Sequence, residues 1–402
     1  MWRRLSPRRI CLGIILITAV AILYAAFKAS SIIIPKACTD DQTTRIFDNL
    51  CNLYQSQAVG GNLCEVICTS KSIIYEDCLF KGKGKKVIAA TYNSKKIILK
   101  SRNERLEEFE LLFSANDKGG FAPPEMDYDS FKSMFKSHME ALMGMKLVDS
   151  EDVLLSKMWT SPILQNDELT PGEMNSVWTL VQQSEFNYLK YFHGAQFLPD
   201  IYGSCGHFYA VEYIPSGKIL DPSLLSLSEQ WDSAPWPNRA KIGLSLMDLI
   251  ASTETFYSEI LHLCDVKPDN FGVTEDFQVK AIDIDISFFT PQMRDYLQQP
   301  DCTADEECDF FDCHGACNKS TQKCLDVRTN NNFQSVCSDI LMHHHTYPGL
   351  LRNPPAEVAT EITELLDKCV NPSREEKYIQ TPSITKTFQR LHSLLKESLQ
   401  IR

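Results

Sequence analysis

Leu-Cys-Asp-Val-Lys-Pro-Asp-Asn-Phe-Gly-Val-Thr-Glu-Asp-Phe-Gln-Val-Lys-Ala-Ile-Asp-Ile-Asp, residues 263–285, carries the strongest chemical signal in this sequence. Asp265, Lys267 and Asn270 follow the spacing D-x-K-x-x-N, and Asp283 comes after a mostly apolar run. A loop carboxylate of this kind orients an acceptor hydroxyl, and a lysine two residues on neutralises a transferred phosphate. An amide and a second carboxylate bind the metal ion that holds a nucleotide.

These four groups, in this order, are the ones that protein kinases use for phosphoryl transfer. A polar turn between two buried strands would also place acidic residues in water, but it would not require all four positions together. The sequence therefore predicts catalytic roles for Asp265 and Lys267 and metal-binding roles for Asn270 and Asp283. The expected cofactors are ATP and either Mg²⁺ or Mn²⁺.

The upstream sequence supplies candidates for the nucleotide site. Gly82 and Gly84 form a glycine-rich turn, which lets backbone N–H groups approach phosphates, although a third glycine is missing. Two strand-like runs follow at 87–91 and 97–100. The second run ends at Lys100, which we expect to contact the α- and β-phosphates.

A helix is predicted over Thr170–Phe192, because a Thr cap, a proline and a glutamate three residues after the cap begin it. It carries Glu185, our candidate for the ion pair with Lys100. Glu185 is preferred because a strand hairpin at 197–213, with its turn at 203–206, directly follows that helix. The alternatives, closer to Lys100 in sequence, are Glu104, Glu107 and Glu108. The hairpin ends at Glu212 and Tyr213, where backbone groups are expected to contact adenine.

The expected fold is α+β, a bilobal protein-kinase-like fold with a helical insertion in the N-lobe and disulfide-rich segments. The N-lobe is predicted at 79–213 with its insertion at 101–169, and the C-lobe at 214–402. The insertion has apolar residues at helical spacing. Its end, Gln165–Glu173, resembles part of a calcium loop but lacks the acidic residues and the glycine of one, so calcium binding is not expected. C-lobe helices are predicted at 236–254, 358–369 and 384–399.

The N-terminus predicts a membrane anchor. Residues 1–9 contain four arginines, residues 10–27 are apolar and uncharged, and Lys28 follows. The basic side should stay in the cytosol, giving a type II protein of the endoplasmic reticulum membrane with a luminal body. A cleaved signal peptide is the alternative, and it would permit a Golgi or secreted location.

The chain has fifteen cysteines, which favours disulfides in an oxidising compartment. They concentrate in the predicted luminal segment 28–78 and in a C-lobe insertion at 302–324. Zinc is a weaker alternative, since C-x-x-C pairs are absent from the first segment. Asn318-Lys319-Ser320 is a glycosylation sequon. The triplet at 343–345 is His-His-His, which we interpret as an exposed run rather than a metal site.

The chain resembles the divergent protein kinase domain 1 family of cysteine-rich, type II membrane proteins of the endoplasmic reticulum. The resemblance covers nearly the whole chain: the basic tail, the anchor, the luminal cysteines, Cys-Asp at 264–265 and the strand before Asp283. It implies a kinase-like fold. The His and Arg that usually precede the catalytic Asp are Leu263 and Cys264 here, and the usual Asp-Phe-Gly reads Asp283-Ile284-Asp285. Asp285 either restricts the backbone at this point or adds a metal ligand.

Two classes of function remain open. The first is a luminal kinase that transfers phosphate from ATP to a hydroxyl of a secretory-pathway protein or glycan. The second is a pseudokinase that acts as a binding scaffold, which the missing glycine and the changed motifs favour. Transfer of another group, such as a nucleotidyl group, would use the same residues. The net charge of −12 argues against nucleic acid as a partner.

Overall fold

The computed structural model describes residues 39–80, 84–112, 127–159, 168–214, 235–342, 349–373, 375–376 and 378–401. The predicted cytosolic tail at 1–9, the anchor at 10–27, Gly82 and the histidine triplet lie outside these ranges. Among the residues described, no helix has the length and apolar character needed to cross a membrane.

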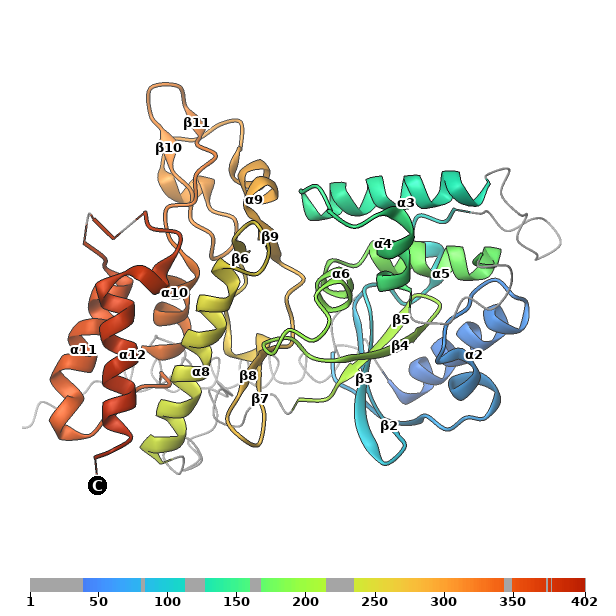
Figure 1. Cartoon of the computed structure of the whole chain (residues 1–402), viewed down its shortest axis with the longest axis horizontal. Coiled ribbons are helices and arrows are strands. Elements are labelled where there is room, and N and C mark those ends of the chain that lie inside the picture. Colours follow the sequence, from blue (N-terminus) through green and yellow to red (C-terminus); the bar gives the residue numbers. More distant parts are fainter. Residues whose placement is uncertain are drawn as a thin grey trace, which may run out of the picture.

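The predicted α+β class is confirmed, and the chain forms two lobes (Figure 1). The N-lobe contains a five-stranded antiparallel sheet with the strand order β1-β2-β3-β5-β4. Its strands are β1 Ile74–Cys78, β2 Lys86–Tyr92, β3 Lys95–Ser101, β4 Ile201–Cys205 and β5 Phe208–Glu212. The first strand lies inside the predicted cysteine-rich segment 28–78, so that segment contributes directly to the N-lobe sheet.

The alternation of side chains along β3 divides the N-lobe core between the two faces of the sheet. Ile97 and Leu99 pack on the face covered by helix α2, Asp40–Gln55. Ile98 packs on the opposite face, and Lys100, two residues later, follows it there. Two disulfides, Cys51–Cys68 and Cys64–Cys205, hold the α2 side together. These bonds confirm the preference for disulfides over zinc.

Helices of the insertion and the helices after it cover the face that carries Lys100 (Figure 1). They are α3 Tyr128–Met143, α4 Glu151–Met158, α5 Pro171–Val181 and α6 Ser184–Tyr191. The capping box of Thr170 and Glu173 begins α5, as predicted. The single helix predicted over Thr170–Phe192 is wrong, because the chain forms two helices that are separated at Gln182 and Gln183.

Amide side chains explain this break. Gln183 Oε1 accepts a hydrogen bond from Arg102 N at 2.8 Å, and Gln183 Nε2 donates to His207 O at 2.9 Å. Gln182 Nε2 donates to Glu110 O at 2.8 Å. The two glutamine side chains at the break therefore form hydrogen bonds with backbone groups of three neighbouring segments. Neither glycine nor proline marks the break in the sequence.

The hairpin before the lobe boundary differs from its prediction by a few residues. Strand β4 continues through Gly203 to Cys205, and the turn lies at Gly206 and His207 rather than at 203–206.

The C-lobe is built around α8, Trp236–Glu254, which has the predicted bounds. The two other predicted helices are present: α12, Lys386–Ser398, packs against α8, and α11, Ala356–Val370, packs against α12 (Figure 1). Two short antiparallel pairs lie toward the N-lobe: β6 Leu261–Leu263 with β9 Ser287–Phe289, and β7 Phe271–Val273 with β8 Val279–Ala281. The remaining elements are α9 Thr290–Leu297, α10 Asn332–Val336, β10 Cys317–Asn318, β11 Lys323–Cys324, the π-helical turns Glu65–Thr69 and Cys337–Leu341, and the 3₁₀ turns Leu106–Glu108, Pro268–Asn270, Asp305–Cys308 and Pro382–Ile384.

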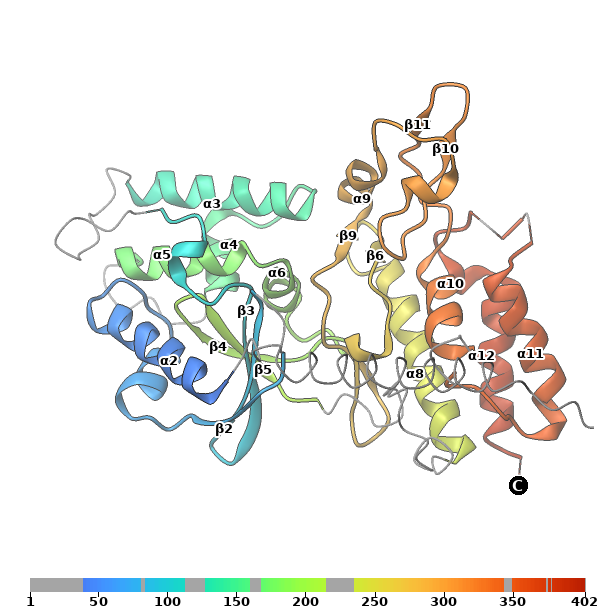
Figure 2. The ribbon, with the colours of Figure 1, turned by 180° about the vertical axis from the view of Figure 1, so that it is seen from behind.

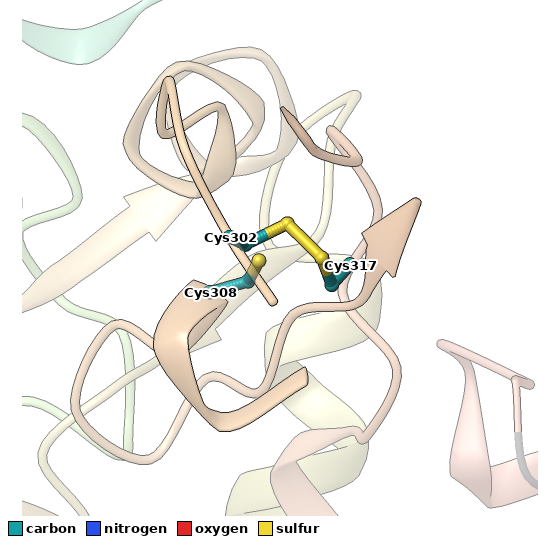
Figure 3. A group of neighbouring side chains, drawn as sticks. All are labelled: Cys302, Cys308 and Cys317. Carbon is teal, nitrogen blue, oxygen red and sulfur yellow. A yellow bond between two sulfur atoms is a disulfide. The ribbon is translucent and has the colours of Figure 1, made fainter. Parts of the chain in front are cut away.

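The cysteine-rich insertion at 302–324 projects from the C-lobe at the β10–β11 hairpin, as both opposite views show (Figures 1 and 2). Its disulfides are Cys302–Cys317 and Cys308–Cys324. The sulfur atoms of Cys302, Cys308 and Cys317 lie within 4.8 Å of one another (Figure 3). Oxidised cysteines offer no thiolate to a metal, so this group braces the segment and is not a zinc site.

Candidate active site

The predicted catalytic residues meet in the loop between β6 and β7. Asp265 Oδ2 accepts hydrogen bonds from Lys267 Nζ at 2.6 Å and from Asn270 Nδ2 at 2.8 Å. Asn270 Nδ2 also donates to Asp265 O at 2.8 Å. One amide thus fixes both the backbone and the carboxylate of Asp265, while the Lys267 side chain remains 46% exposed.

The β7–β8 hairpin brings Asp283 beside this loop. Asn270 O accepts hydrogen bonds from Ile282 N at 2.8 Å and from Asp283 N at 3.3 Å. The two residues predicted to bind metal are therefore joined through their backbones. Carboxylate and amide oxygens suit Mg²⁺ or Mn²⁺, so the donor set fits the expected ion.

Lys100 and Glu185 form a buried ion pair across the N-lobe. Lys100 Nζ lies 2.5 Å from Glu185 Oε1 and donates to Ile282 O at 2.6 Å. Lys100 thus connects β3, α6 and the segment that carries Asp283. Burial raises the pKa of Glu185, whereas Lys100 and Lys85 oppose that rise. The alternative Glu104 instead pairs with Lys86, at 3.2 Å.

Lys85 is a site residue that our sequence reasoning missed. Its Nζ lies 2.6 Å from Asp283 Oδ1, 3.1 Å from Asp285 Oδ2 and 3.7 Å from Glu185 Oε2. The signal was present, because Lys85 directly follows the glycine-rich turn. Gly84, with φ of +88°, adopts a backbone conformation that favours glycine and leads into Lys85.

Two charged aspartates beside Lys85 have opposite pKa shifts. Burial would raise the pKa of Asp283, but Lys85 and Lys100 lower it below its ordinary value. Burial and the neighbouring Asp283 charge raise the pKa of Asp285. The lowered pKa favours the ionised form of Asp283, which is the state that a metal ligand needs.

A cavity of about 230 Å³ lies between the lobes next to these groups. It is lined by apolar side chains and by Lys100, Glu212, Tyr213 and Asp283. The side chain of Glu212 pairs with Lys280 of the C-lobe at 2.6 Å, so this residue ties the lobes together. The Glu212 N–H is already bonded to Asp200 O at 2.8 Å. Of the predicted site residues, Lys100, Glu212, Tyr213 and Asp283 line this cavity, and Glu185, Asp265, Lys267 and Asn270 connect to them through the contacts above. Gly84 precedes Lys85, which contacts Asp283.

The cysteine-rich insertion braces the predicted catalytic loop, residues 264–270, and sequence reasoning did not predict this contact. Cys264, immediately before Asp265, forms a disulfide with Cys313. Asp312 N donates to Cys264 O at 2.9 Å, and Asp312 Oδ2 accepts from Val266 N at 2.5 Å. The backbone on both sides of Asp265 is therefore held by two consecutive residues of the insertion.

Arg328 supports the strand that leads into the catalytic loop. It is buried, and it donates to Asn332 Oδ1 at 2.7 Å and to Leu263 O at 3.5 Å. Burial lowers the pKa of Arg328 to about 9. Asn332 Oδ1 also accepts from Leu263 N at 2.9 Å. These contacts anchor β6 to α10.

Comparison with known proteins identifies two matching family models. Residues 177–372 match the model described as "Protein-kinase domain of FAM69". Residues 3–158 match the model described as "N-term cysteine-rich ER, FAM69". The mouse protein named "Divergent protein kinase domain 2A" (Mus musculus) is 29% identical over 186 residues, which are 43% of this chain and 40% of that protein. The similarity therefore spans less than half of that relative.

Proposed function

Because the chain belongs to the FAM69 family of kinase-like proteins, we propose that it transfers phosphate from ATP to a hydroxyl of a secretory-pathway protein or glycan. The observation that carries the proposal is a connected group of side chains: Lys100 and Asp283 line one interlobe cavity, Glu185 pairs with Lys100, and Asn270 joins Asp265 to Asp283. These residues come from strands, a helix and a loop that are far apart in sequence.

Each residue has a role that its contacts support. Asp265, oriented by Asn270, accepts or orients the proton of the acceptor hydroxyl. Lys267 stabilises charge on the transferred group, and Lys100, held by Glu185, binds the phosphates. Asn270 and Asp283 would hold Mg²⁺ or Mn²⁺, which supplies charge neutralisation at the phosphates when bound. Adenine would lie against the apolar wall, with polar contacts from the backbone of Tyr213 and Ile214.

The compartment proposed is the lumen of the endoplasmic reticulum. Six disulfides among the residues described support an oxidising environment. The description of the family model matched by residues 3–158 also refers to the endoplasmic reticulum. Attachment through residues 10–27 and a type II topology are part of this proposal.

The nucleotide part of the proposal is tested by thermal unfolding of the purified full-length chain with ATP and Mn²⁺. A ligand at one hundred times its Kd stabilises the folded state by about 2.7 kcal/mol. We expect a metal-dependent rise in Tm that is lost in Asp283→Ala. Asp48→Ala, an exposed change on α2, is the matched control and should keep the rise. An unchanged Tm at millimolar nucleotide concentration, in a folded sample, would contradict nucleotide binding.

The scaffold alternative has one observation in its favour, which is that Lys85 already engages Asp283. A pseudokinase would bind nucleotide weakly or without turnover. Its binding partners should then be unaffected by Asp265→Ala and by Lys100→Ala, which a pull-down of secretory-pathway proteins with each variant would measure.

A further inference from the structure

We propose that Lys85 is an exchangeable cation: it holds Asp283 and Asp285 until a metal ion displaces it, and it then binds the triphosphate of the nucleotide. The inference rests on the proposed function and adds a residue and a binding order to it. Lys85 would thus oppose metal binding alone and favour metal binding together with ATP.

The contacts of Lys85 place its charge where a metal is expected. Its Nζ contacts Asp283 Oδ1 at 2.6 Å, and this carboxylate is the predicted metal ligand. Asp285 Oδ2 and Glu185 Oε2 lie 3.1 and 3.7 Å away, respectively. The side chain is 18% exposed, so solvent screens these interactions only in part. A divalent cation on Asp283 would therefore meet a fixed ammonium at close range.

The charge balance of the cluster explains why the exchange depends on nucleotide. Three carboxylates, those of Glu185, Asp283 and Asp285, face the ammonium groups of Lys85 and Lys100. Adding a divalent cation to this group leaves excess positive charge. A triphosphate supplies the negative charge that both the ion and Lys85 then share.

The position of Lys85 in the chain allows such an exchange. It lies between Gly84, which has a positive φ of +88°, and Lys86, the first residue of β2. A second cavity of about 230 Å³ is lined by Lys85, Lys100, Arg102 and Asp285. Lys100 lines this cavity and also the interlobe cavity. The ammonium of Lys85 therefore borders open space that Lys100 separates from the interlobe cavity.

This role also accounts for an unusual residue. Asp285 stands where kinases usually have glycine, and its carboxylate holds Lys85 at 3.1 Å. The added carboxylate is thus a second partner for the lysine. On this account Asp285 is a partner of Lys85 and not a metal ligand.

The test compares Lys85→Met with the wild-type chain and with Lys95→Met, which replaces an exposed lysine on β3. Two titrations are made by thermal shift: Mn²⁺ alone, and ATP at fixed Mn²⁺, with adenosine as the probe that lacks phosphates. Lys85→Met should bind Mn²⁺ alone roughly tenfold more tightly and ATP roughly tenfold more weakly, which is the size of an ordinary coupling between sites. Adenosine binding should be unchanged, and Lys95→Met should behave like the wild type.

Asp285→Asn is the second variant and does not depend on the folding of Lys85→Met. It weakens the hold on Lys85 but leaves the lysine in place, so Mn²⁺ alone should bind more tightly while ATP binding is kept. Weaker Mn²⁺ binding would make Asp285 a metal ligand and overturn the inference. The inference would also be overturned if Lys85→Met had wild-type affinity for Mn²⁺ alone or wild-type affinity for ATP. A wild-type chain that does not respond to Mn²⁺ and ATP would instead defeat the proposed function itself.

Discussion

The ion pair of Lys100 and Glu185 is the part of the site that single substitutions test most sharply. Both side chains are buried, and removing one partner of a buried pair leaves an uncompensated charge. We expect Glu185→Gln to lower the free energy of unfolding by about 3 kcal/mol. Lys100→Met in the same background should cost much less than it does alone. Denaturant unfolding of the two single variants and the double variant measures this coupling. Additive losses would mean that the two residues do not act as a pair.

The sequence was informative about single residues where their spacing and order match those of kinase motifs, as for Lys100 and Asp283. Lys85 was missed although it directly follows the glycine-rich turn, because no sequence spacing links it to carboxylates that are distant in the chain.

The pH dependence of stability is also a property of single residues. Burial lowers the pKa of His207 to about 4, and burial with the nearby Arg328 charge lowers the pKa of His262 to about 3. An unfolded histidine takes up a proton near pH 6.5, whereas these folded ones do not, so stability is complete above that pH and falls below it. The expected slope is about 1.4 kcal/mol per pH unit for each histidine between pH 6.5 and 4. Unfolding of His207→Gln as a function of pH should show a reduced slope, with exposed His193→Gln as the control. An equal slope in both variants would rule out His207 as the cause.

At the scale of elements, the cysteine-rich insertion is expected to serve the catalytic loop as well as its own stability. The Cys264–Cys313 bond joins residues 49 positions apart. Because it restricts the unfolded chain, we expect it to stabilise the folded state by about 4 kcal/mol. The Cys302–Cys317 bond joins residues 15 positions apart, and the same effect is expected to contribute about 3 kcal/mol of stability. Replacing either pair by alanines should lower Tm. Only the Cys264 and Cys313 pair should also lower kcat at a temperature where both variants remain folded, because it touches the backbone beside Asp265. Equal kcat losses would mean that the bond stabilises the fold without positioning the loop.

Sequence patterns located α8, α11 and α12, since apolar residues at helical spacing are a local property of the sequence. They missed the break between α5 and α6, which depends on tertiary hydrogen bonds made by Gln182 and Gln183. Disulfide pairing was equally out of reach, because Cys64 and Cys205 are 141 residues apart and meet only in the folded sheet.

At the scale of the whole molecule, two lobes enclose the candidate site and disulfides lie on both sides of it. The interlobe pair of Glu212 and Lys280 lies beside the interlobe cavity, with Glu212 Oε2 and Lys280 Nζ 2.6 Å apart. The bilobal α+β architecture was predictable because motifs of both lobes occur in a fixed order along the sequence. The direct linkage of the insertion to the catalytic loop was not predictable, since it arises from the way the C-lobe folds back on itself.

The most direct test of the central claim is transfer of labelled γ-phosphate from ATP, with Mn²⁺, by the full-length chain to a mixture of secretory-pathway proteins and glycans. Wild-type chain should label at least one acceptor, and Asp265→Ala should not, although it keeps the nucleotide-dependent rise in Tm. Equal labelling by the two chains, or none by a wild-type chain that binds ATP, would contradict a phosphotransferase that uses Asp265.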